Sequence, residues 1–165
     1  MRQTSPMFNK VLVKLWIFGF LYSTISINNL NAQEPSKNDR FVKAVIQLMS
    51  SFSIKRGLEE DPICKQKNYK DFSVEEVVAS MPDSAFKNEG DREAMRKQIE
   101  KFKTVVDVVE ADGRPMWKKM YEQTIVSYKA GGVIPNTRDG HCDVMYQAAS
   151  NIFLNAKNNF KLMEK

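Results

Sequence analysis

The chain has 165 residues, a length that fits a single domain with a hydrophobic core of its own. Its formal charge at pH 7 is +5, and 42% of its residues are hydrophobic. All 20 acidic residues follow position 33, whereas Arg2, Lys10 and Lys14 precede it, so residues 33–165 carry a charge of only +2. A charge this small does not indicate a concentrated basic face, and we expect no nucleic-acid partner.

The first 32 residues have the layout of a secretory signal peptide. Their three basic residues lead into the apolar run 15–22, and a polar tail follows at 28–32. Ala32 supplies the small residue expected before a cleavage site, although Leu30 stands where a second small residue is preferred. We expect cleavage after residue 32 and secretion to the extracellular space. The alternative is an uncleaved signal anchor, because residues 11–27 approach the ~17-residue lower limit for spanning a bilayer.

The sequence contains two cysteines, Cys64 and Cys142. In a secreted chain, two cysteines favour one disulfide, with two free thiols as the alternative. The two positions lie 78 residues apart. In the chain-entropy treatment, a link closing such a loop stabilises the fold by about 4–5 kcal/mol.

After a polar entry segment at residues 33–38, the apolar spacing predicts a helical domain over residues 39–165. The first helix begins with Asn38 or Asp39 as its cap and ends at Gly57. An irregular connection over 58–72 follows.

Ser73 and Glu76 have the spacing of a capping box, which opens a short helix that ends before Pro82. A polar bridge over residues 83–90 contains at most a single helical turn.

Asp91 caps a long helix that ends at Gly113. Residues 105–109 contain four valines, which also suit a strand. The helical spacing of the apolar residues before them favours the helix.

A tight joint from Asp112 to Pro115 then leads into the next helix, which ends at residues 131–132. We expect the long helices from Asp91 onward to form an antiparallel trio.

The last helix extends from about Asp139 to the end of the chain. Its apolar stripe repeats at steps of three and four and comprises Met145, Ala149, Ile152, Phe153, Ala156, Phe160 and Met163. Cys142 lies on the same stripe. The predicted fold is therefore an all-α compact bundle of four main helices and one short helix, stapled by one disulfide.

His141 is the only histidine, and it precedes Cys142. A Cys–His pair can support nucleophilic catalysis, but neighbouring residues on a helix point about 100° apart. We therefore expect His141 to face solvent near the start of the last helix. Together with two distant cysteines, one histidine does not complete a four-ligand zinc set without carboxylates. No catalytic residue, cofactor or metal site is predicted, and the chain is not expected to be an enzyme.

Methionine and aromatic side chains dominate the predicted core, and methionine adapts to irregular shapes. Such a core can line a ligand cavity, although a solid core is the alternative. The candidate lining residues are Phe102, Trp117, Met120, Tyr121, Met145 and Phe153. We interpret the chain as a small secreted helical protein that binds a protein partner or a small apolar ligand. The alternative is a membrane-tethered helical domain held by residues 11–27.

Overall fold

A computed structural model describes residues 36–164, which contain five α-helices, three short 3₁₀ helices and one isolated β-bridge. The α-helices are α2 (Lys37–Glu60), α3 (Val74–Ala79), α4 (Glu89–Val105), α5 (Met116–Ala130) and α6 (Gly140–Lys161). The 3₁₀ helices are η1 (Cys64–Lys67), η2 (Asp83–Ala85) and η3 (Leu162–Glu164). The predicted all-α fold, with four main helices, one short helix and the Cys64–Cys142 disulfide, is confirmed. The predicted signal peptide lies outside the described residues.

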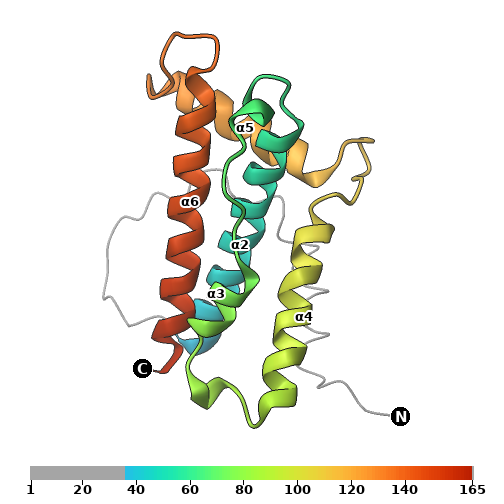
Figure 1. Cartoon of the computed structure of the whole chain (residues 1–165), viewed down its shortest axis with the longest axis vertical. Helices are drawn as coiled ribbons and strands as arrows, with labels where there is room; N and C mark the ends of the chain where they lie inside the picture. Colours follow the sequence, from blue (N-terminus) through green and yellow to red (C-terminus); the bar gives the residue numbers. More distant parts are fainter. Residues whose placement is uncertain (1–35, 165) are drawn as a thin grey trace. The chain divides into compact units, whose positions relative to one another are not determined.

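The helices α2 and α6 lie side by side in opposite directions and share the most extensive packing of any two elements (Figure 1). They have 24 and 22 residues, so each is about 33–36 Å long. Fully buried Ala44, Ala149 and Ala156 keep the side chains between the two helices small. At the end of the pair remote from the disulfide, the rings of Phe41 and Phe160 meet edge to face at 5.9 Å.

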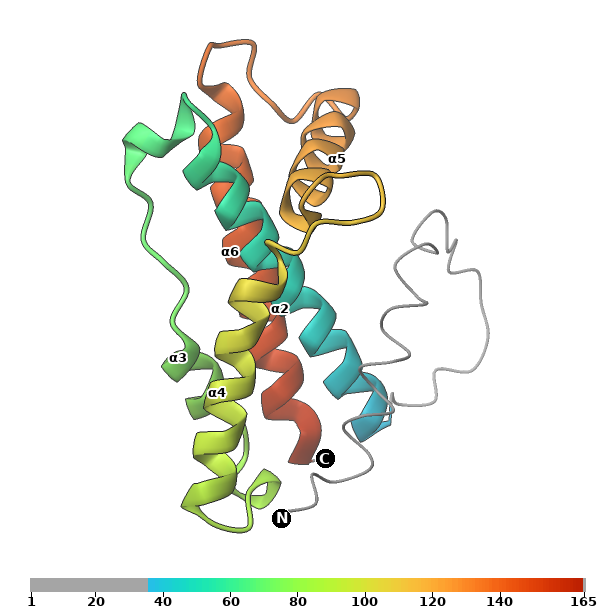
Figure 2. The ribbon, with the colours of Figure 1, turned by 90° about the vertical axis from the view of Figure 1, so that its right-hand side faces the viewer.

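The remaining helices pack mainly around α2 or on one another. α5 packs chiefly on α2, α4 contacts both α3 and α2, and α5 lies on the other side of α2 from α3 (Figure 2). Five consecutive residues of α2, 51–55, are buried, which happens only when a helix is covered on several sides. The predicted antiparallel trio of α4, α5 and α6 is therefore wrong, because α2 supplies the apolar surface that these helices need.

The first helix is longer than predicted at both ends. Ser36, rather than Asn38 or Asp39, is the N-cap: its hydroxyl accepts from the amide of Asp39, whose carboxylate accepts from the Ser36 amide. Gly57 does not end the helix, since its carbonyl still accepts from the amide of Asp61. A Cβ added to Gly57 would lie 2.7 Å from the Tyr121 Cβ and closer still to its ring. The glycine is therefore required by the close approach of α5.

Only one of the two hydrogen bonds of the predicted capping box is formed at the start of α3. The Ser73 hydroxyl accepts from the Glu76 amide at 3.2 Å. The Glu76 carboxylate, however, accepts from Lys157 of α6 at 2.8 Å. Glu76 therefore links α3 to α6 instead of completing the capping box.

The predicted end of the long helix at Gly113 is wrong, because α4 stops at Val105. Buried Val106 caps it, while Val108 and Val109 project outward, 46% and 62% exposed. The chain then folds back on itself: the Val108 carbonyl accepts from Met116, and a β-bridge joins Val109 to Pro115. The predicted start of α4 also shifts, since Asn88 rather than Asp91 is its cap.

The tight joint at residues 112–115 is present. Gly113 has φ +77°, a backbone conformation that favours glycine, and its amide donates to the Glu110 carbonyl.

Within residues 36–164, we find no helix with both the length and the apolar character needed to span a bilayer.

Replacing Gly57 with alanine tests the contact between α2 and α5. The added methyl group overlaps the Tyr121 side chain, and such overpacking costs about 1–3 kcal/mol. This cost outweighs the gain of just under ~1 kcal/mol in helix propensity. We expect a lower free energy of unfolding in urea titrations monitored by circular dichroism.

Gly131→Ala is the matched control, because a Cβ there meets its nearest atom at 3.5 Å. Equal stability of the two variants would contradict the close-packing role of Gly57.

Candidate functional site

Five side chains from three parts of the chain meet where α2 ends and α6 begins. They are Asp61, Cys64, Tyr121, His141 and Cys142, and we call them the junction cluster. The Cys64–Cys142 disulfide lies at its centre, and both cysteines are fully buried. The His141 Nε2 atom lies 3.0 Å from Asp61 Oδ2, 3.2 Å from Cys64 Sγ and 3.8 Å from Cys142 Sγ. A single ring nitrogen therefore faces the carboxylate and both sulfurs.

Asp61 is fixed in this cluster by the backbone around it. Its own amide donates to the Gly57 carbonyl and closes α2, while its Oδ1 accepts from the amides of Ile63 and Cys64 at 2.8 and 3.2 Å. The same carboxylate thereby satisfies two backbone amides at the start of η1. Oδ2 is left to accept from Tyr121 and to face His141.

Partial burial raises the pKa of Asp61, but the hydrogen bonds from His141 and from the two backbone amides outweigh it. The net effect holds the pKa of Asp61 below its ordinary value, so the carboxylate is ionised at neutral pH. Burial and the adjacent Asp61 charge raise the pKa of Tyr121. The Tyr121 hydroxyl therefore stays protonated and acts as a donor.

The first turn of α6 is held beside η1 by a second set of contacts. The Lys67 ammonium lies 3.0 Å from Asp139 and 2.8 Å from Asp143, and the Tyr69 hydroxyl donates to Asp143. The hydrogen bonds from Lys67 lower the pKa of both carboxyl groups. Acidic residues in the first turn also favour the helix dipole. These contacts fix the stretch of α6 that carries His141 and Cys142.

Stacked aromatic rings continue this attachment along α6. Tyr69 stacks on Tyr146 at 4.4 Å, and Phe72 stacks on Phe153 at 4.7 Å. Residues 68–73, which have no regular structure, thereby lie along α6 and connect η1 to α3.

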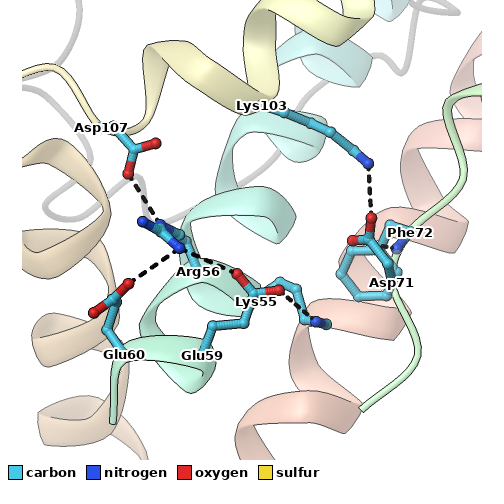
Figure 3. Close-up of polar contacts among 8 residues, drawn as sticks. All are labelled: Lys55, Arg56, Glu59, Glu60, Asp71, Phe72, Lys103 and Asp107. Carbon is cyan, nitrogen blue, oxygen red and sulfur yellow. Dashed lines mark hydrogen bonds and ion pairs between the residues drawn. The ribbon is translucent and has the colours of Figure 1, made fainter. Parts of the chain in front are cut away.

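Charged residues of α2 form a further network beside the cluster (Figure 3). Arg56 contacts Glu59, Glu60 and Asp107, and the Asp107 contact joins α2 to the turn after α4. Lys103 of α4 likewise holds Asp71 at 2.9 Å. Arg56 is 39% exposed, so its individual pairs contribute little more than about 1 kcal/mol each. The network joins α2 to the turn after α4, and α4 to the segment that carries Asp71.

Lys55 differs from these residues because its side chain is only 8% exposed. Its ammonium donates to Glu59 at 2.7 Å. The two residues border a surface hollow of about 140 Å³ that is also lined by Leu58, Cys64, Lys65, Asn68 and Tyr69. The hollow reaches the junction cluster at Cys64.

The expectation that His141 faces solvent is wrong, since its side chain is only 15% exposed and reaches both sulfurs. The 100° separation describes where neighbouring side chains leave the helix, not where a long side chain ends. A proton relay is not formed, because a relay uses opposite ring nitrogens for its two partners, whereas here Nε2 faces both Asp61 and Cys64. Both sulfurs are also occupied by the disulfide. In this state the cluster is structural.

The six candidate lining residues differ in their burial. Phe102, Tyr121, Met145 and Phe153 are buried, with exposures of 0–6%, while Trp117 and Met120 are half-buried. The hollow beside Cys64 contains none of the six, and neither does a second hollow of about 230 Å³ between α3 and α4. Their role in lining a ligand cavity stays a prediction.

No known protein family matches the chain, and no curated protein or solved structure is similar to it.

Replacing Asp61 with asparagine tests the charge of the junction cluster. The folded carboxyl has a lower pKa than the unfolded one, which is near 3.9, so its ionised form stabilises the fold above about pH 4. This contribution disappears as the pH falls through the folded pKa. We expect Asp61→Asn to lower the free energy of unfolding by about 1.5–3 kcal/mol at pH 7, and the difference from wild type to shrink below pH 4.

Urea titrations at pH 7 and pH 3 measure this difference. Asp83→Asn is the control, since Asp83 is 97% exposed and pairs with Arg92 at the surface, so it should change stability by less than about 0.5 kcal/mol. A pH-independent effect of Asp61→Asn would refute the role of the charge.

Proposed function

We propose that this chain is an extracellular, disulfide-linked helical protein that acts by binding a protein partner. Two features support the compartment. The Cys64–Cys142 disulfide is of a kind that persists in oxidising environments, and the basic, apolar N-terminal stretch has the layout of a signal peptide.

A protein partner is favoured over a small apolar ligand by the way the core is filled. Ligand pockets for small molecules usually have volumes of about 300–1,000 Å³ and mostly apolar walls. The two hollows described above have about 140 and 230 Å³, and charged residues line much of both. An apolar ligand would therefore have to displace packed core side chains.

The observation that carries the proposal is the distribution of exposed apolar side chains. Within residues 36–164, six large apolar side chains are exposed, and four of them fall between residues 108 and 133. They are Val108, Val109, Val126 and Val133, with exposures of 46–66%. This stretch comprises α5 and its two flanking loops, and we call it the α5 face.

The α5 face also defines the chemistry of the partner. Residues 108–133 contain three acidic and four basic residues, so the face carries a net charge of only +1. Of the 15 residues of α5, only Tyr121 is buried, although the helix also carries Trp117, Met120 and Tyr128. Aromatic residues and methionine are enriched in protein interfaces. The expected partner is a protein with an apolar contact surface and little net charge.

The compartment is tested by expressing the full chain in a eukaryotic host and measuring the intact mass of the product in the medium. We expect a chain that starts near Gln33 and has no free thiol until it is reduced. Full-length protein retained by the cells would instead favour the membrane-tethered alternative.

Native mass spectrometry of the same product separates the two kinds of ligand. A co-purified mass of a few hundred daltons that leaves on denaturation would contradict the preference for a protein partner.

Val126→Lys tests the α5 face. Val126 is 66% exposed, so lysine should not disturb the fold, but it places a charge in an apolar contact. We expect immobilised wild type to retain a protein from extracellular extract of the producing tissue, and Val126→Lys to bind that protein more weakly by over about 1 kcal/mol.

Leu154→Lys is the matched control, because Leu154 is 53% exposed on α6 and lies outside the α5 face. Retention that is identical for wild type and both variants would refute the assignment of this surface.

A further inference from the structure

The junction cluster brings three potential metal ligands close together and holds a carboxylate beside one of them. The ligand atoms of Cys64, His141 and Cys142 all lie within 4.8 Å of one another. Asp61 Oδ2 lies 3.0 Å from the same His141 nitrogen that faces the sulfurs. The oxidised sulfurs cannot serve as thiolate ligands, so the set becomes complete only when the disulfide is open.

The distances in the cluster are close to those of a tetrahedral zinc site. Zinc lies about 2.3 Å from sulfur and 2.0–2.1 Å from nitrogen, so a tetrahedral site separates ligand sulfur from nitrogen by about 3.5 Å. The His141 Nε2 atom lies 3.2 and 3.8 Å from the two sulfurs. The sulfurs themselves must move apart once the bond between them is broken.

We propose that the reduced protein binds one Zn²⁺ ion through Cys64, Cys142 and His141, with Asp61 as the fourth ligand. Two thiolates and an imidazole select zinc over hard ions such as Mg²⁺ and Ca²⁺. The site concerns the reduced chain, whereas the proposed extracellular function concerns the oxidised chain. Each can therefore fail without the other.

A dithiol reductant can open the disulfide in a balanced reaction. The dithiol gives two electrons and two protons to the protein disulfide and itself becomes a disulfide, leaving thiols at Cys64 and Cys142. Zn²⁺ then displaces the two thiol protons into solvent. His141 binds through Nε2 as its neutral form, with the ring proton on Nδ1.

The structure also provides a route to the site. Cys64 lines the surface hollow of about 140 Å³, while the side chains of Asp61 and His141 are 16% and 15% exposed. Both cysteines are themselves fully buried, so a reductant and an ion can reach the sulfurs from this side once the side chains around the hollow move aside. Bound zinc would then hold the end of α2 against the start of α6, as the disulfide does.

Cobalt(II) is the probe for the test, because it occupies zinc sites and absorbs visible light. The full chain is reduced with a water-soluble phosphine, which takes up oxygen from water and becomes a phosphine oxide, and is then titrated with Co²⁺. We expect one equivalent to give near-ultraviolet thiolate-to-cobalt absorption and the visible bands of a tetrahedral ion. Zn²⁺ should abolish both and raise the melting temperature of the reduced protein, with no change in the oxidised protein.

Variants assign the ligands. His141→Ala and Asp61→Asn should each weaken Co²⁺ binding by more than about tenfold, since even residues behind the direct ligands typically contribute 10–100-fold. Asp83→Asn is the matched control: this carboxylate is 97% exposed, pairs with Arg92 of α4 and is not part of the junction cluster, so binding should be unchanged. Circular dichroism shows whether each variant remains folded. If one ligand variant unfolds, the Co²⁺ affinity of the other ligand variant tests the proposal.

Three results would overturn the proposal. They are the absence of thiolate-to-cobalt absorption in the folded reduced chain, equal affinity of both ligand variants and the Asp83→Asn control, and an identical spectrum in urea, where the cysteines are unstructured.

Discussion

The antiparallel pairing of α2 with α6 is the constraint on which the rest of the structure depends. The two helices bury a narrow seam of alanines and larger apolar side chains, closed at one end by the disulfide and at the other by Phe41 and Phe160. Because α2 is buried over five consecutive residues, it also supplies the surface on which α4 and α5 pack. Loss of the pair would therefore remove the support of the other helices as well.

The same pairing explains the polar residues at the disulfide end. Antiparallel helices bring the C-terminal end of α2, with its partial negative charge, beside the N-terminal end of α6, with its partial positive charge. Asp61, Asp139 and Asp143 gather around the α6 end, and Lys67 offsets the last two. Asp61 is partly buried, which would be costly for an unpartnered carboxylate, but each of its oxygens accepts hydrogen bonds. The cluster is stable because its desolvated charge is satisfied from three elements at once.

The helices, their order and the disulfide could be predicted from the sequence because they depend on local spacing and on the presence of only two cysteines. The role of Gly57 and the end of α4 at Val105 could not be predicted from local spacing. A glycine that ends a helix and a glycine that makes room for a neighbouring ring look the same in the sequence, and only the position of Tyr121 distinguishes them. The valines after Val105 suited a helix by spacing, yet the chain turns there to bring α5 back onto α2.

The position of His141 was also predicted wrongly, although one signal was available. It precedes Cys142, and Asp61 lies three positions before Cys64, so the predicted disulfide would by itself bring the two residues close.

A disulfide needs only its two sulfurs, and apolar neighbours would shield it as well as polar ones do. Here the buried bond has instead an imidazole, a carboxylate and a phenol around it, each held by contacts that do not involve the S–S bond: Asp61 by two backbone amides, Tyr121 by its place against Gly57, and His141 by Asp61. These positions would therefore survive opening of the bond. What holds α2 to α6 at this end would then depend on the redox state, while the positions of Asp61 and His141 would not.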